Sequence, residues 1–262
     1  MFKEMIQELI QYRHLLYTLA WRDIKIKYKQ SVMGFMWAIF MPMMVVASGI
    51  LVKKAFAILS GRPMTLADIA SVTVKALPWS FFVASIQFAT NSLIGNINLV
   101  TKIYFPREVF PLSAVLANLL DFAVATATLA IILVFAKIGI SIYILWLPVL
   151  LLLFILFTAG LGMLFACANL FFRDVKYIVQ VILTFGIFFT PVFYDAKMFH
   201  KWAPLILINP IASLLEAINS VVVLHQPPDM FWLGYAFISS ILTFLISWYI
   251  FHQSEYKFAE SI

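Results

Sequence analysis

Long apolar stretches separated by short polar segments run through most of the chain, and this pattern predicts membrane-spanning helices. About 20 apolar residues are needed to cross the hydrocarbon core of a bilayer. Six stretches meet this requirement, at residues 31–52, 78–100, 109–135, 143–168, 177–193 and 231–251. The pattern therefore predicts an all-α membrane protein whose six-span transmembrane domain occupies residues 31–262.

A different periodicity marks residues 1–30. Apolar side chains recur there every three or four positions, with polar side chains filling the opposite side; they are Phe2, Met5, Ile6, Leu9, Tyr12, Leu16 and Leu19. This spacing is typical of an amphipathic helix, which we expect to lie in the membrane interface. A soluble helix packed on a partner protein is the alternative.

A basic cluster directly precedes the first predicted span and consists of Arg22, Lys25, Lys27 and Lys29. On a helix, Lys25 and Lys29 are one turn apart while Lys27 points almost oppositely, so positive charge surrounds the chain. Lysine stems can lie along apolar surface while their ammonium groups reach phosphate. The plainer interpretation is a topology signal. With both termini in the cytoplasm, 11 of the 18 Lys and Arg residues fall on inner segments, as the positive-inside rule favours.

Residues 196–228 are too long and too apolar for a simple loop, yet they do not form a plain span. Asn209-Pro210 interrupts the apolar run, and Glu216 in mid-membrane would cost several kcal/mol. We therefore expect two short re-entrant helices on the outer side, with Asn209 as an N-cap before Pro210 and Asp229 capping the last span. With Trp202, this segment is a candidate outer gate.

The composition excludes a soluble domain, because only 11% of the residues are charged and 64% are hydrophobic, whereas soluble domains carry about 25% charged residues. The single cysteine, Cys167, excludes an intrachain disulfide. There is no G-x-x-x-x-G-K-[ST] nucleotide loop, no H-E-x-x-H and no paired Cys/His spacing. We therefore expect no catalytic residues, no metal site and no cofactor bound by this chain, and no nucleic-acid partner.

Asp121 is the one acidic residue deep inside a predicted span, about 18 Å from its start on a helical rise. An intramembrane carboxylate indicates a functional role, either in a polar pathway or as a proton site. A carboxyl hydrogen-bonded between helices is an equally good interpretation. Asn118 lies one turn away on the same face.

Aromatic residues make up 16% of the chain, and sugar faces stack well on aromatic rings. Packing against lipid or neighbouring helices is the commoner role of such residues in a span. Together with Asp121, the candidates for a channel lining are Trp37, Phe40, Phe81, Phe88, Phe185 and Phe189.

Two short connections, predicted to face the cytoplasm, combine charges with aromatic residues. The first contains Tyr104, Phe105, Pro106, Arg107 and Glu108, and the second contains Arg173 and Asp174. They are either ordinary solvated turns or a docking surface for a soluble partner.

Four segments resemble the permease subunits of polysaccharide-export ABC transporters, which export O-antigen, capsule or teichoic acid: RDIKIKYKQSVMGFMWAIFMP, TKIYFPREVFPLS, NLFFRDVKYIVQ and INPIASLLEAI. The resemblance covers nearly the whole chain in order. It implies a homodimer with two separate ATP-binding cassette subunits, which bind the ATP and Mg. It also implies a bacterial cytoplasmic (inner) membrane location and a lipid-linked polysaccharide cargo on an undecaprenyl diphosphate carrier.

The resemblance also gives roles to the candidate residues. Residues 104–108 would form a short helix that couples to the ATPase, together with Arg173 and Asp174. The basic cluster would attract the lipid diphosphate at the cytoplasmic entrance. Three alternatives remain: an ABC permease for a small-molecule or teichoic-acid cargo, a proton-coupled carrier using Asp121, and a membrane-embedded enzyme, which the missing catalytic cluster disfavours.

Overall fold

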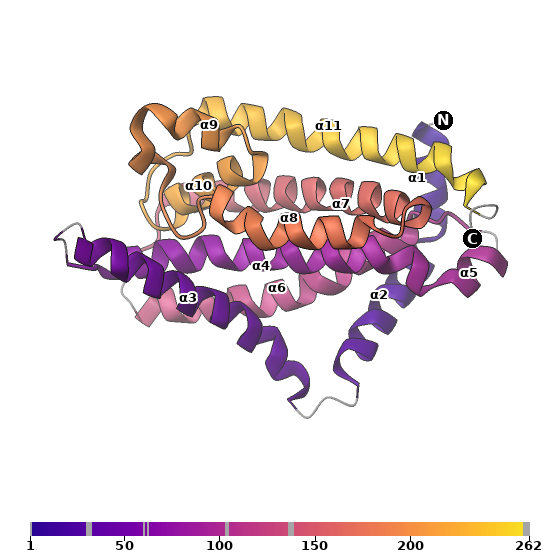
Figure 1. Cartoon of the computed structure of the whole chain (residues 1–262), viewed down its shortest axis with the longest axis horizontal. Helices are drawn as coiled ribbons and strands as arrows, with labels where there is room; N and C mark the ends of the chain where they lie inside the picture. The colour runs from indigo at the N-terminus through magenta and orange to yellow at the C-terminus, as the bar shows by residue number, and fades with distance from the viewer. Residues whose placement is uncertain are drawn as a thin grey trace.

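The computed structural model describes residues 2–29, 33–59, 61, 63–102, 105–135 and 139–258, and helices make up most of this part of the chain. Three long helices make the centre of an elongated bundle (Figure 1): α4 (Leu66–Gly95), α6 (Val109–Phe135) and α7 (Leu147–Phe171). α11 (Met230–Ser254) packs along α7, and α8 (Val175–Phe189) packs on α4 and α7. Among the described residues there is no strand, as the sequence predicted.

The predicted amphipathic segment is helical but divided into α1 (Phe2–Gln11) and α2 (Arg13–Tyr28). α2 packs against α6. After a 3-10 turn at Gly34–Met36, α3 (Trp37–Leu59) packs on α4 and α6, so that α2 and α3 form the two arms of a V in Figure 1. The start of α1 and the end of α11 lie at the same end of the bundle, which agrees with termini on one side of the membrane.

Five helical segments are long and apolar enough to cross a membrane, at residues 34–59, 66–95, 109–131, 142–171 and 230–257. They confirm the prediction of an all-α membrane protein. α8 has only 15 residues and ends at Phe189, four residues before the predicted end. Pro191 explains the early end, because the residue before a proline is restricted to extended backbone, as Thr190 is here. The count of six spans stays a prediction.

The helix that contains the predicted second span, α4, begins at Leu66, well before the predicted start of the span at residue 78. Thr65 and Asp68 form a capping box, in which each side chain binds the other's backbone N–H and fixes the helix start. The earlier start brings Lys75 and Trp79 into the buried interior of the bundle. The first span also continues past its predicted end at residue 52, to Leu59.

The two short helices predicted before the last span are present as α9 (Ala203–Leu207) and α10 (Pro210–Val222), after a 3-10 segment at Ala196–Trp202. Asn209 caps α10 by accepting a hydrogen bond from the Ile211 N–H at 3.1 Å, with Pro210 at the first helical position, as predicted. Asp229 caps α11, also as predicted. α10 packs on α4, α7 and α11, so this segment is part of the bundle rather than a surface loop.

Two helices of the bundle approach each other closely at Gly160. A Cβ atom on this residue of α7 would lie 2.8 Å from the Cα atom of Phe244 in α11. Only glycine allows this approach, because any other side chain would force the two backbones apart. The close approach of α7 and α11 at this point therefore requires glycine.

The short helix predicted at residues 104–108 is absent where the structure describes this segment. A six-residue helix, α5 (Ile97–Lys102), comes before it, Tyr104 lies outside the described residues, and residues 105–108 form a bend and a turn before α6. The last described element is a 3-10 turn at Glu255–Lys257.

Candidate functional site

A cavity of about 650 Å³, the central pocket, lies among α2, α3, α4, α6 and α8. Its walls are mainly apolar and aromatic, and a group of polar side chains lies on α2, α4 and α6. The aromatic members are Trp37, Trp79, Phe81, Phe88 and Phe122 beside Tyr28, and the main polar members are Lys27, Gln87, Asn118 and Asp121. Ligand pockets of this size commonly combine apolar walls with a few polar groups that orient the ligand.

The polar group of the central pocket is centred on Asp121. Lys27 forms an ion pair with one oxygen of its carboxylate, and the Tyr28 hydroxyl donates a hydrogen bond to the other. The Lys27 ammonium also donates to the side-chain oxygen of Asn118 at 3.0 Å. The same ammonium lies 5.0 Å from the centre of the Phe88 ring. Asp121 is therefore both hydrogen-bonded between helices and part of a pocket wall, so the two interpretations of this residue are compatible.

The basic cluster does not act as a single surface. Arg22 pairs with its neighbour Asp23 at 2.8 Å, and Lys25 lies 5.7 Å from the Trp21 ring centre. Lys29 makes no ion pair with any residue that the structure describes. Only Lys27 reaches the pocket. This difference agrees with the helical spacing, which places Lys27 on the side of the helix opposite to Lys25 and Lys29.

Four of the seven predicted channel residues line the central pocket, namely Trp37, Phe81, Phe88 and Asp121. Phe40 is outside the lining but contacts Trp37 edge to face, with ring centres 5.6 Å apart. Phe185 and Phe189 do not line the pocket and are exposed on α8. The residues of α8 that do line the pocket are Leu183, Thr184 and Ile187. The channel role of all seven residues stays a prediction.

A second cavity, of about 410 Å³, lies between α4 and α8 and is mostly polar. We call it the polar cavity; its lining is Gln87, Thr90, Asn91, Lys176, Tyr177, Val179 and Gln180. Gln87 belongs to both cavities, so they are neighbours. Amide and hydroxyl groups both donate and accept hydrogen bonds, which suits a ligand with many hydroxyls. The sequence analysis missed this site, because its residues come from two helices about 90 positions apart.

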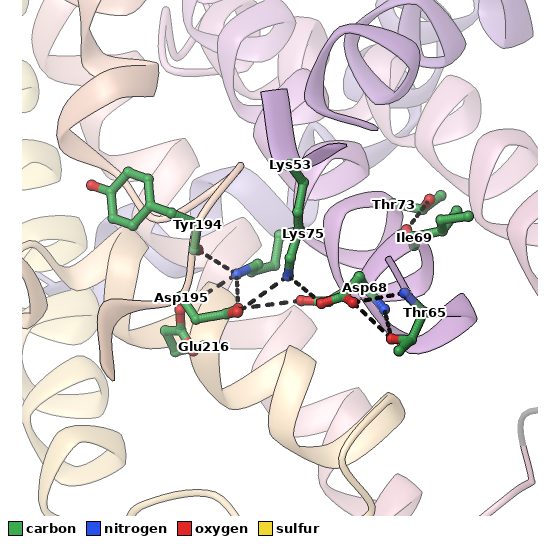
Figure 2. A network of polar contacts seen from close by, with 10 residues as sticks. Lys53, Thr65, Asp68, Ile69, Thr73, Lys75, Tyr194, Asp195 and Glu216 are labelled. Carbon is green, nitrogen blue, oxygen red and sulfur yellow. Dashed lines mark hydrogen bonds and ion pairs between the residues drawn. The ribbon is translucent and has the colours of Figure 1, made fainter. Parts of the chain in front are cut away.

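An ion-pair network that the sequence analysis also missed lies near α10, at the end of the bundle opposite α1 in Figure 1, and its side chains are drawn in Figure 2. Lys75 of α4 is completely buried, and its ammonium lies 2.8 Å from Asp195 and 3.5 Å from Glu216, while it donates to the carbonyl oxygen of Tyr194 at 2.6 Å. Lys53 of α3 pairs with Asp195 at 3.1 Å and with Asp68 at 3.3 Å. We call these five charged groups the outer network. They join α3, α4 and α10 to the segment before α9.

The outer network explains Glu216, which the sequence places in an apolar run. Its carboxylate pairs with Lys75 and accepts a hydrogen bond from the Ala196 N–H at 3.0 Å. Asn209 also fastens this segment, because its amide donates to the Thr190 hydroxyl at 3.1 Å. Trp202, the other predicted gate residue, is 70% exposed and makes no such contact with a described residue. Gating itself stays a prediction.

Burial alone would raise the pKa of Asp195, but the ammonium groups of Lys75 and Lys53 outweigh it and lower this pKa to about 2. The Asp195 carboxylate therefore stays ionised at any physiological pH. The charge that holds the outer network together is permanent under those conditions.

At the opposite end of the bundle, the turn before α6 is fastened to the end of α11. The Arg107 N–H donates to the Glu255 carboxylate at 3.0 Å, and its guanidinium donates to the Glu255 carbonyl oxygen at 2.7 Å. Glu108 is buried and lies 3.0 Å from the ring nitrogen Nδ1 of His252. We call these four residues the C-terminal joint.

The C-terminal joint changes the interpretation of the predicted coupling residues. Phe105 is only 6% exposed and packs on Phe110, with ring centres 5.4 Å apart, so it belongs to the core and not to a surface. Pro106 and Glu108 are buried too. Arg173 and Asp174, in the connection between α7 and α8, are exposed and available to a partner. Phe105 is therefore not exposed, as a solvated turn or a docking surface would require, while the coupling role of both connections stays a prediction.

Ligand atoms of Glu108, His252 and Glu255 lie within 4.8 Å of one another, which is close enough to share a metal ion. The expectation of no metal site depended on local spacing, which cannot detect groups 144 positions apart. Arg107 already donates to Glu255, and His252 already lies 3.0 Å from Glu108, so each acidic side chain has a partner within the chain. We therefore interpret the cluster as an ion-paired joint between chain segments.

These features define a class before any relative is considered: a helical membrane protein with an amphiphilic pocket, which is the architecture of a transport subunit. The chain belongs to the ABC-2 type transporter family, which residues 14–223 match. The family that the sequence resemblance indicated is thereby confirmed.

Three curated relatives are similar over nearly their whole length. The chain is 29% identical to the O-antigen export system permease protein RfbA of Myxococcus xanthus, over 98% of this chain and 99% of the relative. Two proteins of the same name from Klebsiella pneumoniae are 28% and 26% identical, each over 94% of both chains.

Proposed function

We propose that this chain is the permease subunit of an ATP-driven exporter that moves a lipid-linked, O-antigen-like polysaccharide from the cytoplasm across the bacterial inner membrane. The observation that carries the proposal is the amphiphilic central pocket, in which Lys27 and Tyr28 lie beside aromatic rings. The full-length similarity to O-antigen export permeases supports the same cargo class.

The chemistry of the pocket matches the parts of such a cargo. A lipid diphosphate carries several negative oxygens, and the cationic group on α2 can bind them by charge-assisted hydrogen bonds. Sugar rings can stack on the aromatic walls of the pocket, and the isoprenoid chain can pack against its apolar walls; the aromatic residues are Trp37, Phe81 and Phe88. The neighbouring polar cavity offers amide groups to the hydroxyls of the first sugars.

The partners follow from the family. An ABC transporter needs ATP-binding subunits, and we propose that two separate copies bind ATP and Mg and dock near the exposed residues Arg173 and Asp174. A second copy of this chain would complete the pathway. The exposed apolar faces of α3 and α8 support such a pairing, because a membrane channel needs a wall on every side; these faces include Met41, Met44, Ile182, Phe185 and Phe189.

The proposal is tested by reconstituting the chain with its ATP-binding partner in vesicles. We expect ATP-dependent movement of lipid-linked glycan across the bilayer, and we expect Trp37→Ala and Phe88→Ala to slow it. Phe237→Ala removes an equally exposed aromatic ring on α11, outside the pocket, and serves as the matched control. Transport of a small dye in preference to the glycan would contradict the proposal and favour a small-molecule permease.

A proton-coupled carrier is the second candidate, because Asp121 lies in the pocket wall with both carboxylate oxygens hydrogen-bonded. Such a carrier would work without an ATPase and would respond to a pH gradient. Vesicles that hold this chain alone under an imposed pH gradient separate the two functions, since we expect no glycan movement there.

A further inference from the structure

Lys27 is the member of the basic cluster whose charge is balanced inside the central pocket. Its ammonium is held by Asp121 and Asn118 of α6, and Tyr28 binds the second oxygen of the same carboxylate. These contacts join the end of α2 to the middle of α6. The central pocket therefore holds a nearly neutral pair at the place where an anionic head group would bind.

The pair is placed so that a ligand can reach it. The Lys27 side chain is 25% exposed and that of Asp121 is 15% exposed, so neither is sealed in the core. Both residues line the pocket together with Phe88 and Trp37. An anion bound at the ammonium would lie beside the aromatic wall, as the head group of an amphiphile would.

A carboxylate and a phosphate interact with an ammonium group in the same way. Both accept charge-assisted hydrogen bonds from nitrogen and from a hydroxyl. A diphosphate offers more oxygens and more negative charge than Asp121, so it can compete for Lys27 and Tyr28. Lys29 makes no ion pair with a described residue, and with Lys25 it can raise the local concentration of anions.

Resting on the proposed function, we propose that Asp121 is an internal counter-ion that occupies the phosphate position, and that the diphosphate of a lipid-linked cargo displaces it from Lys27 and Tyr28. The exchange separates α2 from α6, because the contacts of Asp121 and Asn118 with Lys27 hold the end of α2 there. Lys25 and Lys29 attract the head group, Lys27 recognises it, and Asp121 is a positioning residue that keeps the site closed without cargo.

The separation of α2 from α6 can be measured without any transport assay. Spin labels at Ile26→Cys and Leu116→Cys, in a Cys167→Ser background, report this distance, since both positions are exposed on their helices. The complete complex with its ATP-binding partner is placed in nanodiscs. The probe is farnesyl diphosphate, with farnesol as the uncharged control and added phosphatidylglycerol as a membrane phosphate.

We expect farnesyl diphosphate, but neither farnesol nor phosphatidylglycerol, to lengthen the distance. Asp121→Asn should lengthen it without any probe, and Tyr28→Phe should do so in part while keeping all charges. Lys27→Gln removes the ammonium from the same contacts, so it should also lengthen the distance without any probe, and farnesyl diphosphate should then change it little. Glu8→Gln and Lys54→Gln, which change exposed charges elsewhere, should leave the distance and its response unchanged.

The outcomes separate this inference from the proposed function. An unchanged distance in Asp121→Asn and Tyr28→Phe, in complexes that assemble normally, overturns the counter-ion role even if glycan export is shown. A distance that responds to farnesyl diphosphate while the complex moves no glycan supports the exchange and overturns the cargo. An equal response to phosphatidylglycerol overturns cargo recognition, since the site would then read membrane phosphate.

Discussion

The ammonium group of Lys75 lies 2.8 Å from the carboxylate of Asp195, and the Lys75 side chain is completely buried although the residue follows a short polar connection in the sequence. The pair fastens the segment before α9 to the centre of the bundle. A buried charge that loses its partner is strongly destabilising, because desolvation is then uncompensated. The outer network therefore holds the predicted gate region in place.

Replacing Lys75 with methionine tests this relationship. The change keeps the length of the side chain but leaves Asp195 and Glu216 without their shared cation, so we expect the free energy of unfolding to fall by on the order of 3 kcal/mol. Unfolding by sodium dodecyl sulfate measures it. Lys54→Met is the control, because Lys54 is exposed and forms no ion pair with a described residue. Equal stability of the two variants would contradict a structural role for the network.

Acid should weaken the same network. The pKa of Asp195 is about 2 in the folded protein, below its ordinary value of 3.8. A lowered pKa contributes stability that is fully present above the ordinary value and is lost as the pH falls towards the folded pKa. We therefore expect the contribution of Asp195 to thermal stability to be constant above pH of about 4 and to decline between about 4 and 2. The Asp195→Asn variant should be less stable at neutral pH, and its thermal stability should fall less between pH of about 4 and 2. If the variant loses as much stability in acid as the unchanged protein, Asp195 is not the source of the loss.

The long helices could be predicted because apolar length alone determines them, and local chemistry determined several of their ends. Asn209-Pro210 and Asp229 predict caps that the structure contains. The start of α4 lay outside the predicted span because the charged residue Lys75 interrupts the apolar run. Its partners, Asp195 and Glu216, are more than 100 positions away, so no local pattern could reveal that the charge is compensated.

The candidate site shows the same limit. The helical spacing of Asn118 and Asp121 predicts one face, and both groups do bind one ammonium. Which cation they would meet depends on the packing of α2 against α6, which the sequence does not state. Phe105 shows a second limit, since an aromatic residue beside charges in a short connection was expected in a solvated turn or a docking surface and is instead part of the core.

Two predicted coupling positions should now behave differently. Phe105→Ala removes a buried ring and should lower the free energy of unfolding by on the order of 3 kcal/mol. Arg173→Glu changes an exposed residue, so we expect normal stability but weaker recovery of the ATP-binding partner in a pull-down. The reverse pattern, with a stable Phe105→Ala chain that loses its partner, would restore the surface interpretation of that residue.

The C-terminal joint should transmit force between the turn before α6 and the end of α11. Glu255→Ala removes the carboxylate that accepts from the Arg107 N–H. We expect the complex to assemble and hydrolyse ATP while the glycan moved per ATP falls several-fold. Tyr256→Phe is the matched control on a neighbouring exposed side chain. If the ratio of transport to hydrolysis is the same in both variants, the joint is only a structural fastening.

The aromatic residues of the predicted channel divide into two groups that cysteine labelling can separate. Trp37 and Phe88 line the central pocket, whereas Phe185 and Phe189 lie on the outer face of α8. In a Cys167→Ser background, single cysteines at the first two positions should react with a water-soluble thiol reagent, and bound lipid-linked glycan should protect them. Cysteines at Phe185 and Phe189 should react in the same way only if a second copy of the chain encloses a water-filled path against α8. Reaction of these two positions with lipid-soluble reagents alone would show that α8 faces lipid, which would confine the cargo path to the pocket within each subunit.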